Sequence, residues 1–156
     1  MQEKNKKDSI VIGTLAEGFV LDHIQAGMAM TVYQLLDLGA LDCTVAIIKN
    51  ASSVKMGRKD IIKVAYPIEK LPENFLSVLG FIDNRITLDI IRENKIVEKK
   101  KLSLPTEVRN VIRCKNPRCI TSVEHSLDQS FILTEPETRV YRCRYCEQKW
   151  DGHLED

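Results

Sequence analysis

The sequence predicts an α+β protein in two parts: an N-terminal ferredoxin-like βαββαβ domain, residues 1–102, and a small all-β domain, residues 103–156. Three observations predict this organisation. Strand-like and helix-like hydrophobic patterns alternate from residue 9 to residue 97. The composition changes at the basic run Lys99-Lys100-Lys101, which a linker-like Leu-Ser-Leu-Pro105 follows. Four of the five cysteines lie in the last third of the chain, in two closely spaced pairs.

The first half of the N-terminal domain contains two strand-like segments and one helix. Ser9–Thr14 is apolar and rich in β-branched residues, which favours a strand, and a turn at Glu17-Gly18 leads into a second extended segment at 19–22. Apolar residues then recur at helical spacing from Met28 to Leu36. Gly39 is expected to end this helix as a left-handed C-cap.

The second half of this domain contains further strands and one more helical repeat. In chain order we expect a strand at 44–49, a loop at 50–57, a strand at 60–66, a helix at 71–82, a strand at 86–91 and, after a turn at 92–95, a short extra strand at 96–97. This order is that of the ferredoxin-like fold, in which two helices pack on one face of an antiparallel sheet. The fold carries no functional information, because many unrelated activities use it.

Charge and motif content exclude several classes of protein. Lysine plus arginine total 23 and aspartate plus glutamate 22, a net charge of +1, whereas a dedicated nucleic-acid binder needs a basic excess. The longest stretch without a charged side chain, Ile24 to Leu36, is too short for a membrane span of roughly 20 apolar residues. The N-terminus lacks the apolar core of a secretory signal, so we expect a cytoplasmic protein. No nucleotide-binding glycine loop or nucleophile elbow is present, which favours a binding protein over an enzyme.

The cysteine spacing predicts a metal site. Cys114-x4-Cys119 and Cys143-x2-Cys146 resemble two metal knuckles, each of which presents two thiolates on one side of the backbone. In a reducing cytoplasm such pairs favour one structural Zn²⁺ per chain over two disulfides or four free thiols. Four protein ligands leave no open coordination position for catalysis, so the metal is expected to be structural. A four-thiolate iron centre has the same ligand set and stays an alternative at this point. Cys43, in an apolar run, is interpreted as a core residue.

The metal also accounts for the small size of the second domain. Metal binding supplies on the order of 10 kcal/mol of folding free energy to a zinc-ribbon-like unit whose own core gives marginal stability. Five basic residues surround the predicted ligands and would offset the formal charge of −2 on a zinc tetrathiolate. They are Arg113, Lys115, Arg118, Arg142 and Arg144.

Three polar residues of the N-terminal domain interrupt apolar segments. Asp22 and His23 end a strand just before a helix, and Lys63 lies within Ile61-Ile62-Lys63-Val64, on the face opposite Ile62 and Val64. Ordinary structural roles explain them from pattern alone: Asp22 caps the helix, His23 is a hydrogen-bonded core residue and Lys63 faces solvent.

Four segments in one order carry a family resemblance that covers residues 10 to 150. They are Val20-Leu-Asp-His-Ile24, Met56-Gly-Arg-Lys-Asp-Ile-Ile-Lys63, Lys99 with Ser103-Leu-Pro105, and the cysteine segments including Cys143-Arg-Tyr-Cys-Glu147. The sequence resembles the regulatory chain of aspartate carbamoyltransferase. That resemblance implies a non-catalytic subunit of pyrimidine biosynthesis, with an allosteric N-terminal domain that binds CTP and ATP. It also implies a zinc domain that contacts the catalytic chain, and a homodimer formed through the N-terminal domains.

The resemblance assigns roles to individual residues. It implies that Asp22 binds ribose hydroxyls, Lys63 contacts base and ribose, and His23 and Lys99 neutralise phosphates, chemistry that suits a carboxylate and cationic donors. Ile12 would lie close to the base. In the zinc domain, the resemblance places Asn116, Arg144 and Glu147 against the catalytic chain.

Three positions depart from the family pattern. Asp89 stands where an asparagine is expected near the base pocket, so a carboxylate replaces an amide donor. Gln25 replaces a common proline, and Asn94 stands where some relatives have an aromatic residue. Two other functions compete with the resemblance: a zinc ribbon that binds nucleic acid through the basic residues near the cysteines, and a rubredoxin-like redox protein. A low aromatic content of 6% disfavours the first, because single-strand binders use aromatic stacking.

Overall fold

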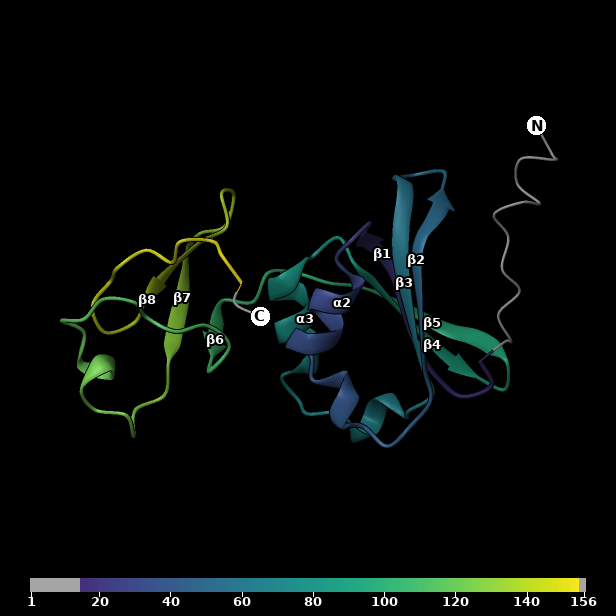
Figure 1. The fold of residues 1–156 in the computed structure, drawn as a ribbon, viewed down its shortest axis with the longest axis horizontal. Coiled ribbons are helices and arrows are strands. Elements are labelled where there is room, and N and C mark those ends of the chain that lie inside the picture. Colours follow the sequence, from purple (N-terminus) through teal and green to yellow (C-terminus); the bar gives the residue numbers. More distant parts are fainter. Residues whose placement is uncertain (1–14, 155–156) are drawn as a thin grey trace.

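The computed structural model describes residues 15–154, which form two domains side by side along the long axis of the molecule (Figure 1). The strands and α-helices are β1 (Gly18–Gln25), α2 (Ala29–Leu35), β2 (Val45–Ser53), β3 (Gly57–Val64), α3 (Phe75–Ile82), β4 (Thr87–Arg92), β5 (Lys95–Lys101), β6 (Glu107–Arg109), β7 (Ser130–Glu135) and β8 (Val140–Cys143). Three short 3-10 helices accompany them: Leu38–Ala40, Ile68–Lys70 and Ile120–Ser122. The predicted strand at Ser9–Thr14 and the candidate residue Ile12 lie outside the described residues.

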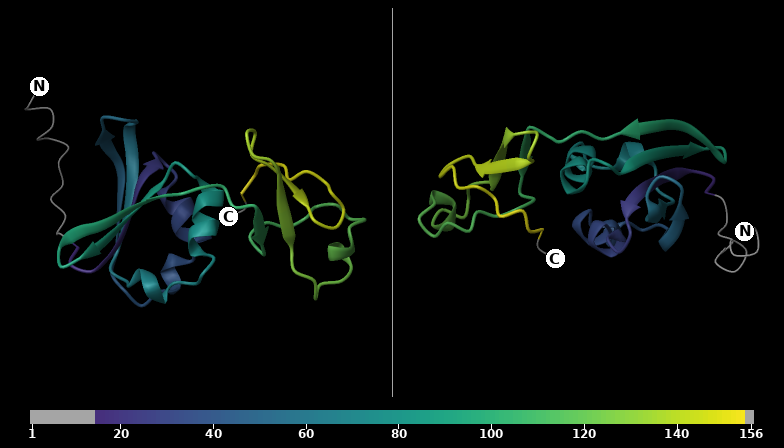
Figure 2. Two further views of the ribbon diagram at one scale, coloured as in Figure 1. Left: turned by 180° about the vertical axis from the view of Figure 1, so that it is seen from behind. Right: turned by 90° about the horizontal axis from the view of Figure 1, so that it is seen from above.

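The five-stranded sheet has the predicted ferredoxin-like topology. Its strand order is β2-β3-β1-β4-β5 and every neighbouring pair is antiparallel. Four strands and two helices account for the βαββαβ unit, and β5 extends the sheet beyond β4. Both helices cover the face that points toward the C-terminal domain, and the opposite face is left without a helix (Figures 1 and 2). The α+β fold class is therefore confirmed.

The core of the N-terminal domain follows the alternation of the strands. Phe19, Leu21, Ile62, Val64 and Leu88 are fully buried between the sheet and the helices, because residues two apart on a strand share a face. Asp60 shares this buried face, and its carboxylate accepts hydrogen bonds from the N–H groups of Gly27 (2.9 Å), Ala29 (3.0 Å) and Asn50 (2.8 Å). The carboxylate that caps the start of α2 is thus Asp60, not Asp22 as the structural interpretation of the sequence had it.

Two local predictions are wrong. Gly39 does not adopt the left-handed conformation; Asp37 does, with φ = 52°, directly after α2 and before a 3-10 turn that contains Gly39. Aspartate tolerates this conformation better than most residues. The loop expected at 50–57 is shorter, because β2 and β3 continue to pair as far as Ser53 and Gly57. The polar sequence of this hairpin misled the prediction, since backbone pairing needs no apolar side chains.

The β4–β5 hairpin confirms the turn predicted at 92–95 and lengthens the strand that follows it. Glu93 and Asn94 both have positive φ, 51° and 64°, the conformation that a two-residue hairpin with the right-handed strand twist requires. The basic run expected at the domain boundary forms the end of β5, where Lys99 pairs with Asp89 and Lys101 with Thr87.

The C-terminal domain is a three-stranded antiparallel sheet, β6-β7-β8, with its own small core. One of its core residues, Phe81, comes from α3 of the N-terminal domain and packs on Tyr141 (ring centroids 4.9 Å apart) and Trp150 (5.0 Å). The Arg139 guanidinium donates to the backbone carbonyl of Phe81 at 3.0 Å. Helix α3 therefore belongs physically to both domains.

The interdomain linker crosses α3 at Gly80. A Cβ at this position would lie 2.3 Å from the carbonyl oxygen of Ser103, so only glycine allows the two backbones to approach so closely. In the part of the chain that the structure describes, no helix is long and apolar enough to cross a membrane.

Candidate functional site

The four predicted cysteines converge on one point of the C-terminal domain. Their sulfur atoms all lie within 4.8 Å of one another. The Sγ atoms of Cys114 and Cys146 are 3.5 Å apart and those of Cys119 and Cys143 are 3.7 Å apart, each contact joining one knuckle to the other. Zn–S bonds of about 2.3 Å in a tetrahedron place sulfur atoms roughly 3.8 Å apart, whereas a disulfide needs about 2.05 Å. The spacing fits a four-sulfur metal site and not two disulfides.

Backbone hydrogen bonds fold each knuckle so that its two thiols point inward. The Cys119 N–H donates to the Asn116 carbonyl at 3.1 Å, and the Glu147 N–H donates to the Cys143 carbonyl at 2.9 Å. Glu147 has φ = 65°, the left-handed conformation that closes the tight second knuckle. Outside the knuckles, the Gln129 side chain accepts the Cys114 N–H at 2.9 Å. The ligand geometry is thus set by the protein backbone.

Burial opposes ionisation of the Cys114 and Cys143 thiols, so they become thiolates only with a partner cation. Burial raises the pKa of Cys114 to about 12 and also raises that of Cys143. Burial acts in the same direction on Cys146, but the Gln148 backbone and the Asn116 side chain outweigh it, and its pKa falls to about 7. A coordinated metal ion removes the protons from such thiols. Because all four donors are protein sulfurs, the ion would have a structural role.

The basic residues around the cysteines are partly balanced by acidic neighbours. Arg144 lies 3.2 Å from the Glu107 carboxylate, and Lys115 lies 2.9 Å from that of Asp151. Arg142 donates to the backbone carbonyl of Glu147 at 3.2 Å. Such pairs weaken the case for a nucleic-acid surface, which needs free cations facing phosphates.

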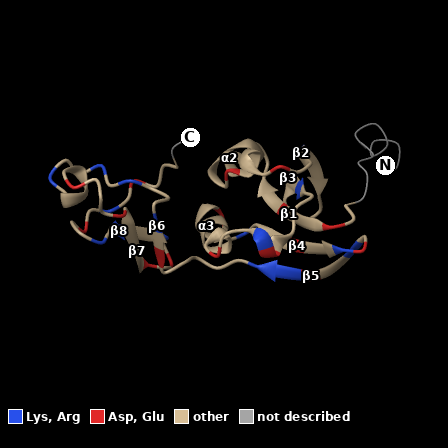
Figure 3. Ribbon diagram, turned by 90° about the horizontal axis from the view of Figure 1, so that it is seen from below, with Lys and Arg blue, Asp and Glu red and all other residues tan. Residues whose placement is uncertain are grey.

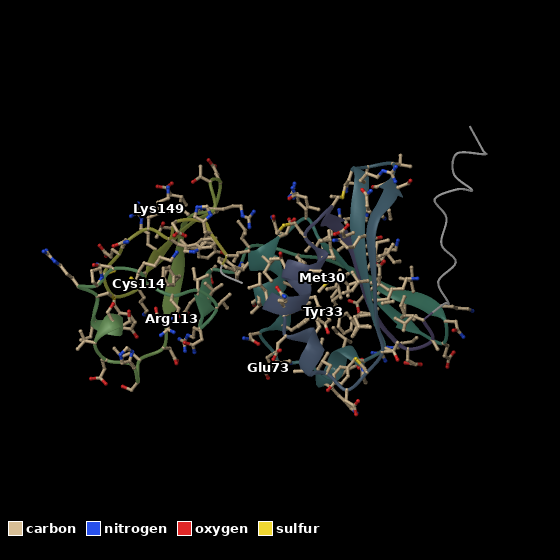
Figure 4. The ribbon with its side chains drawn as sticks, in the orientation of Figure 1. Met30, Tyr33, Glu73, Arg113, Cys114 and Lys149 are labelled. Atoms are coloured by element: carbon tan, nitrogen blue, oxygen red, sulfur yellow. The ribbon has the colours of Figure 1, made fainter. Side chains whose placement is uncertain are left out.

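The three predicted contact residues for a catalytic chain lie on the two knuckles. Arg144 and Glu147 are exposed on the second knuckle, and Asn116 is half-buried in the first. Exposed apolar side chains accompany them: Ile120 is 50% exposed, Val123 75% and Tyr145 44%. Figure 4 shows the labelled Arg113 and Cys114 in this domain, away from Met30 and Tyr33 on α2. The knuckles thus present a mixed polar and apolar surface to solvent.

The predicted polar residues of the N-terminal domain gather on the open face of its sheet. One row of paired residues runs across four strands: Lys63 on β3 pairs with Val20 on β1, Val20 with Asp89 on β4, and Asp89 with Lys99 on β5. Directly opposite residues have Cβ atoms about 4.5–5.5 Å apart. The sequence therefore brings two lysines and a carboxylate from distant segments into one line. Figure 3 shows the basic end of β5 beside β4.

Asp22 and His23 lie beside this row at a break in the β1–β3 pairing. The register shifts between Leu21 and Ile24, and His23 adopts φ = 61°. Such bulges redirect side chains and are common next to functional sites. The His23 Nδ1 lies 2.8 Å from the Thr87 hydroxyl, which fixes the ring toward β4.

Lys59 is a further candidate residue of this site that the sequence interpretation missed. Its ammonium lies 2.8 Å from the Asp22 carboxylate. Burial acts against ionisation of Asp22, but Lys59 and the His23 N–H outweigh it and lower the pKa of the Asp22 carboxyl. The alternation of β3 was the available signal, because Lys59 shares a face with Lys63. Lys63 and Lys99, in contrast, form no ion pair with any other residue of 15–154.

Asp89 is the acidic residue of the row, and it is almost completely buried, at 8% exposure. Burial raises the pKa of its carboxyl, and the nearby charge of Lys99 only partly offsets this. Burial of the ionised carboxylate therefore opposes folding at neutral pH. The contribution of this carboxyl to folding stability is fully present below its pKa in the unfolded chain, about 3.9. This contribution is lost as the pH rises through its higher pKa in the folded chain.

We expect Asp89→Asn to stabilise the N-terminal domain at pH 7 by on the order of 1 kcal/mol, the usual scale of a single substitution. The amide keeps the shape of the carboxylate and removes the buried charge. Urea unfolding at several pH values measures the difference in free energy of unfolding between the variant and the parent. This difference should shrink below about pH 4, where the Asp89 carboxyl is neutral like the amide. Asp42→Asn, at an exposed carboxylate, is the control and should change little. An Asp89→Asn variant less stable than the parent at pH 7 would contradict this account.

Comparisons with known proteins identify the family of the two domains. A family model described as "Aspartate carbamoyltransferase regulatory chain, allosteric domain" matches residues 10–103, and one described as "metal binding domain" of the same chain matches residues 106–153. Aspartate carbamoyltransferase regulatory chains of Clostridium botulinum and Clostridium acetobutylicum are 47% and 43% identical over 143 residues, which cover 92% of this chain and 95% of each relative. The regulatory chain of Bifidobacterium longum is 39% identical over 138 residues, 88% of this chain and 96% of its own. The chain belongs to the family of aspartate carbamoyltransferase regulatory chains, which are non-catalytic, allosteric subunits with a metal-binding domain.

Proposed function

We propose that this chain controls pyrimidine biosynthesis by binding CTP and ATP on the open face of its five-stranded sheet and docking on the catalytic chain through its metal-binding domain. The observation that carries the proposal is the row Lys63–Val20–Asp89–Lys99 with Asp22 and His23 beside it. Two lysines that form no ion pair within residues 15–154 share this row with a carboxylate, and they provide cations for phosphates and an acceptor for hydroxyl groups.

The geometry supports a distinct role for each side chain. Asp22, held ionised by Lys59, is suited to accept hydrogen bonds from ribose hydroxyls. Lys63, at the β3 end of the row, would contact base and ribose, while Lys99 and His23 would face the phosphates. Asp89 lies between the two lysines, where its buried carboxyl would modulate affinity. Ile12, which lies outside the described residues, is proposed to lie near the base.

We further propose that the metal is one structural Zn²⁺ per chain. Zinc accepts tetrahedral four-thiolate coordination without redox chemistry, and the sulfur spacings of 3.5 and 3.7 Å suit it. Metal analysis by mass spectrometry with one zinc and no iron would support this assignment. A coloured, iron-containing protein would contradict it and restore the redox alternative.

Docking is proposed to use the exposed knuckle surface. Asn116, Arg144 and Glu147 supply its polar contacts, and the exposed Ile120 and Tyr145 supply apolar area. A hydrophobic centre with a polar rim is the usual composition of a stable protein interface. Two copies are proposed to pair through their N-terminal domains in a cytoplasmic assembly with the catalytic chain.

Lys63→Gln tests the effector role. Nucleotides act by differential affinity for two arrangements of the assembly, and typical coupling energies are about 1–3 kcal/mol. With the catalytic chain of the same organism, we expect CTP to lower and ATP to raise carbamoyltransferase activity. In the Lys63→Gln complex, half-maximal inhibition should need roughly tenfold more CTP, because a charged hydrogen bond contributes about 1.5–3 kcal/mol.

The control and the contradictory outcomes are well separated. Lys70→Gln, at an exposed lysine outside the sheet, should respond to CTP like the parent. A stable complex without any nucleotide response would leave the docking proposal intact and refute the effector proposal. Failure to form a complex would refute both.

A further inference from the structure

A threonine hydroxyl lies against one of the four cluster sulfurs. The hydroxyl oxygen of Thr121 is 3.1 Å from the Sγ atom of Cys119, and the two residues are almost completely buried, at 2% and 1% exposure. Within residues 15–154, the Cys119 sulfur is the only hydrogen-bond partner of this hydroxyl. Because a buried hydroxyl without a partner costs free energy, this one contact satisfies the Thr121 side chain.

The burial of Thr121 is the reverse of what hydrophobicity predicts for this turn. Thr121 lies in the 3-10 helix Ile120–Ser122, directly after the first knuckle. The apolar side chains of Ile120 and Val123 are 50% and 75% exposed, whereas the polar side chain between them is enclosed. The proposed docking surface accounts for the exposed Ile120 but gives no reason for a buried threonine. The reason must therefore lie in what the hydroxyl contacts.

Local hydrogen bonds fix the position of this hydroxyl. The Ser122 N–H donates to the Cys119 carbonyl at 2.9 Å, and the Ser122 hydroxyl donates to the Asn116 carbonyl at 2.7 Å. Both bonds tie the 3-10 helix to the first knuckle. The β-branched side chain of Thr121 is itself stiff about its first torsion angle. The hydroxyl is therefore held beside the sulfur by the turn and not by a flexible side chain.

The two buried cysteines of the cluster have different hydrogen-bond donors. The backbone N–H groups of Tyr145 and Cys146 serve the Cys143 sulfur, whereas the Thr121 side chain lies at the Cys119 sulfur. A thiolate that ligates a metal has no proton, so the hydroxyl can only donate to it. Hydrogen bonds to charged acceptors are stronger than neutral ones, and a sulfur this buried has little access to water. Thr121 thus supplies the polar contact that a buried Cys119 thiolate needs.

We propose that Thr121 is a positioning residue of the metal site, whose hydroxyl donates to the Cys119 thiolate and thereby strengthens the retention of zinc by this chain. The inference rests on the proposed zinc site and adds to it a residue that is not a ligand. Protein groups that hydrogen-bond to metal ligands typically contribute about 10–100-fold to metal affinity. The same hydrogen bond lowers the energy of the sulfur lone pairs, which gives it a spectroscopic signature.

Thr121→Val in the full chain tests the inference, because valine keeps the shape of threonine and removes the hydroxyl. Competition with a chromophoric zinc chelator should show a zinc affinity at least about tenfold below that of the parent. In the Co²⁺-substituted variant, the sulfur-to-cobalt charge-transfer band should move to longer wavelength, because the sulfur lone pairs rise in energy. Thr121→Ser keeps a hydroxyl at this position and should resemble the parent in both measurements.

Thr134→Val is the matched control. It removes a hydroxyl of the same domain that donates to the Val140 carbonyl at 3.3 Å, and it should keep the zinc affinity and cobalt spectrum of the parent. Tryptophan emission of the zinc-saturated variants should equal that of the parent, which shows that the domain is folded in each. Thr121→Ala compared with Thr121→Ser repeats the hydroxyl comparison at a smaller side chain, should the valine variant not fold.

The outcomes separate this inference from the zinc proposal. Parental zinc affinity and an unshifted cobalt band in Thr121→Val would overturn the role of the hydroxyl and leave the zinc site intact. Equal losses in Thr121→Val and Thr121→Ser would do the same, because the hydroxyl would then make no difference. A parent chain that binds neither zinc nor cobalt would overturn the proposed zinc site together with this inference.

Discussion

Replacing Cys143 with serine is expected to unfold the C-terminal domain and to leave the N-terminal domain folded. Cys143 is 2% exposed, and its sulfur lies 3.7 Å from that of Cys119 in the four-cysteine cluster. A domain of this size has marginal stability from its own core, whereas a structural zinc site contributes about 10–16 kcal/mol. Loss of one ligand therefore removes more free energy than the domain has in reserve. The metal content of the purified variant should fall well below that of the parent.

Trp150 provides the spectroscopic measurement for this variant. It is the single tryptophan of the chain and packs at 5.0 Å on Phe81, so its fluorescence reports the fold of the C-terminal domain. We expect red-shifted emission in Cys143→Ser and a far-UV circular dichroism spectrum that keeps the helical signal of the N-terminal domain. Cys43→Ser, at a half-buried cysteine outside the cluster, is the matched control and should keep both metal and emission. Native emission from metal-depleted Cys143→Ser protein would show that the metal is not required for folding.

Replacing Phe81 with alanine is expected to uncouple the unfolding of the two domains. Phe81 is 1% exposed, makes an edge-to-face contact with Tyr141 and stacks obliquely on Trp150. Truncation of a buried phenylalanine costs about 3–5 kcal/mol through lost burial and the cavity that remains. Because this side chain comes from α3 but fills the core of the C-terminal domain, the loss falls on the interface between the domains.

Thermal unfolding, monitored simultaneously by tryptophan fluorescence and circular dichroism, measures this uncoupling. The parent should give coincident transitions, and Phe81→Ala an earlier fluorescence transition with the metal still bound. Phe75→Ala is the matched control: Phe75 lies on the same helix but packs on Phe19 within the N-terminal core. It should lower the circular dichroism transition at least as much as the fluorescence transition. Coincident transitions in Phe81→Ala would show that Phe81 does not couple the domains.

The predictable part of the fold depended on local patterns. Alternation along β3 correctly places Ile62 and Val64 inside and Lys63 on the open face, because strand geometry alone decides this. The cysteine spacing predicts two local knuckles with two sulfurs each, and the fold of the C-terminal domain brings all four sulfurs together. The order of helices and strands limited the topology to few choices, and the sheet adopts the ferredoxin-like one.

The parts that the sequence did not reveal depend on contacts between distant segments. The ion pair of Lys59 with Asp22 forms across a bulge whose position no local pattern marks. The position of Phe81 in helix α3 does not distinguish it from a core residue of the N-terminal domain, yet it packs in the core of the C-terminal domain. Asp37, not Gly39, adopts the left-handed conformation after helix α2, and Gly39 instead lies against the Tyr33 ring, where an added Cβ would be 3.0 Å from the hydroxyl oxygen.

A route for the proposed signal follows from these long-range contacts. The segment between α3 and β4 carries Arg85, which lines one cavity together with His23 and Thr87, and it ends beside the contact between Thr87 and His23. The preceding end of α3 carries Phe81, whose carbonyl binds Arg139 of the C-terminal domain. A ligand that shifts the segment before β4 would therefore act directly on the contact between the domains. A signal along this segment need not pass through the whole sheet.

Stepwise addition of zinc to metal-free chain in the presence of the catalytic chain tests most directly whether metal-dependent folding creates the docking surface. Analytical ultracentrifugation measures the amount of complex at each step. The account predicts no complex without metal, an increase in proportion to the zinc added and a plateau at one zinc per chain. A full yield of complex before any metal is added would contradict it.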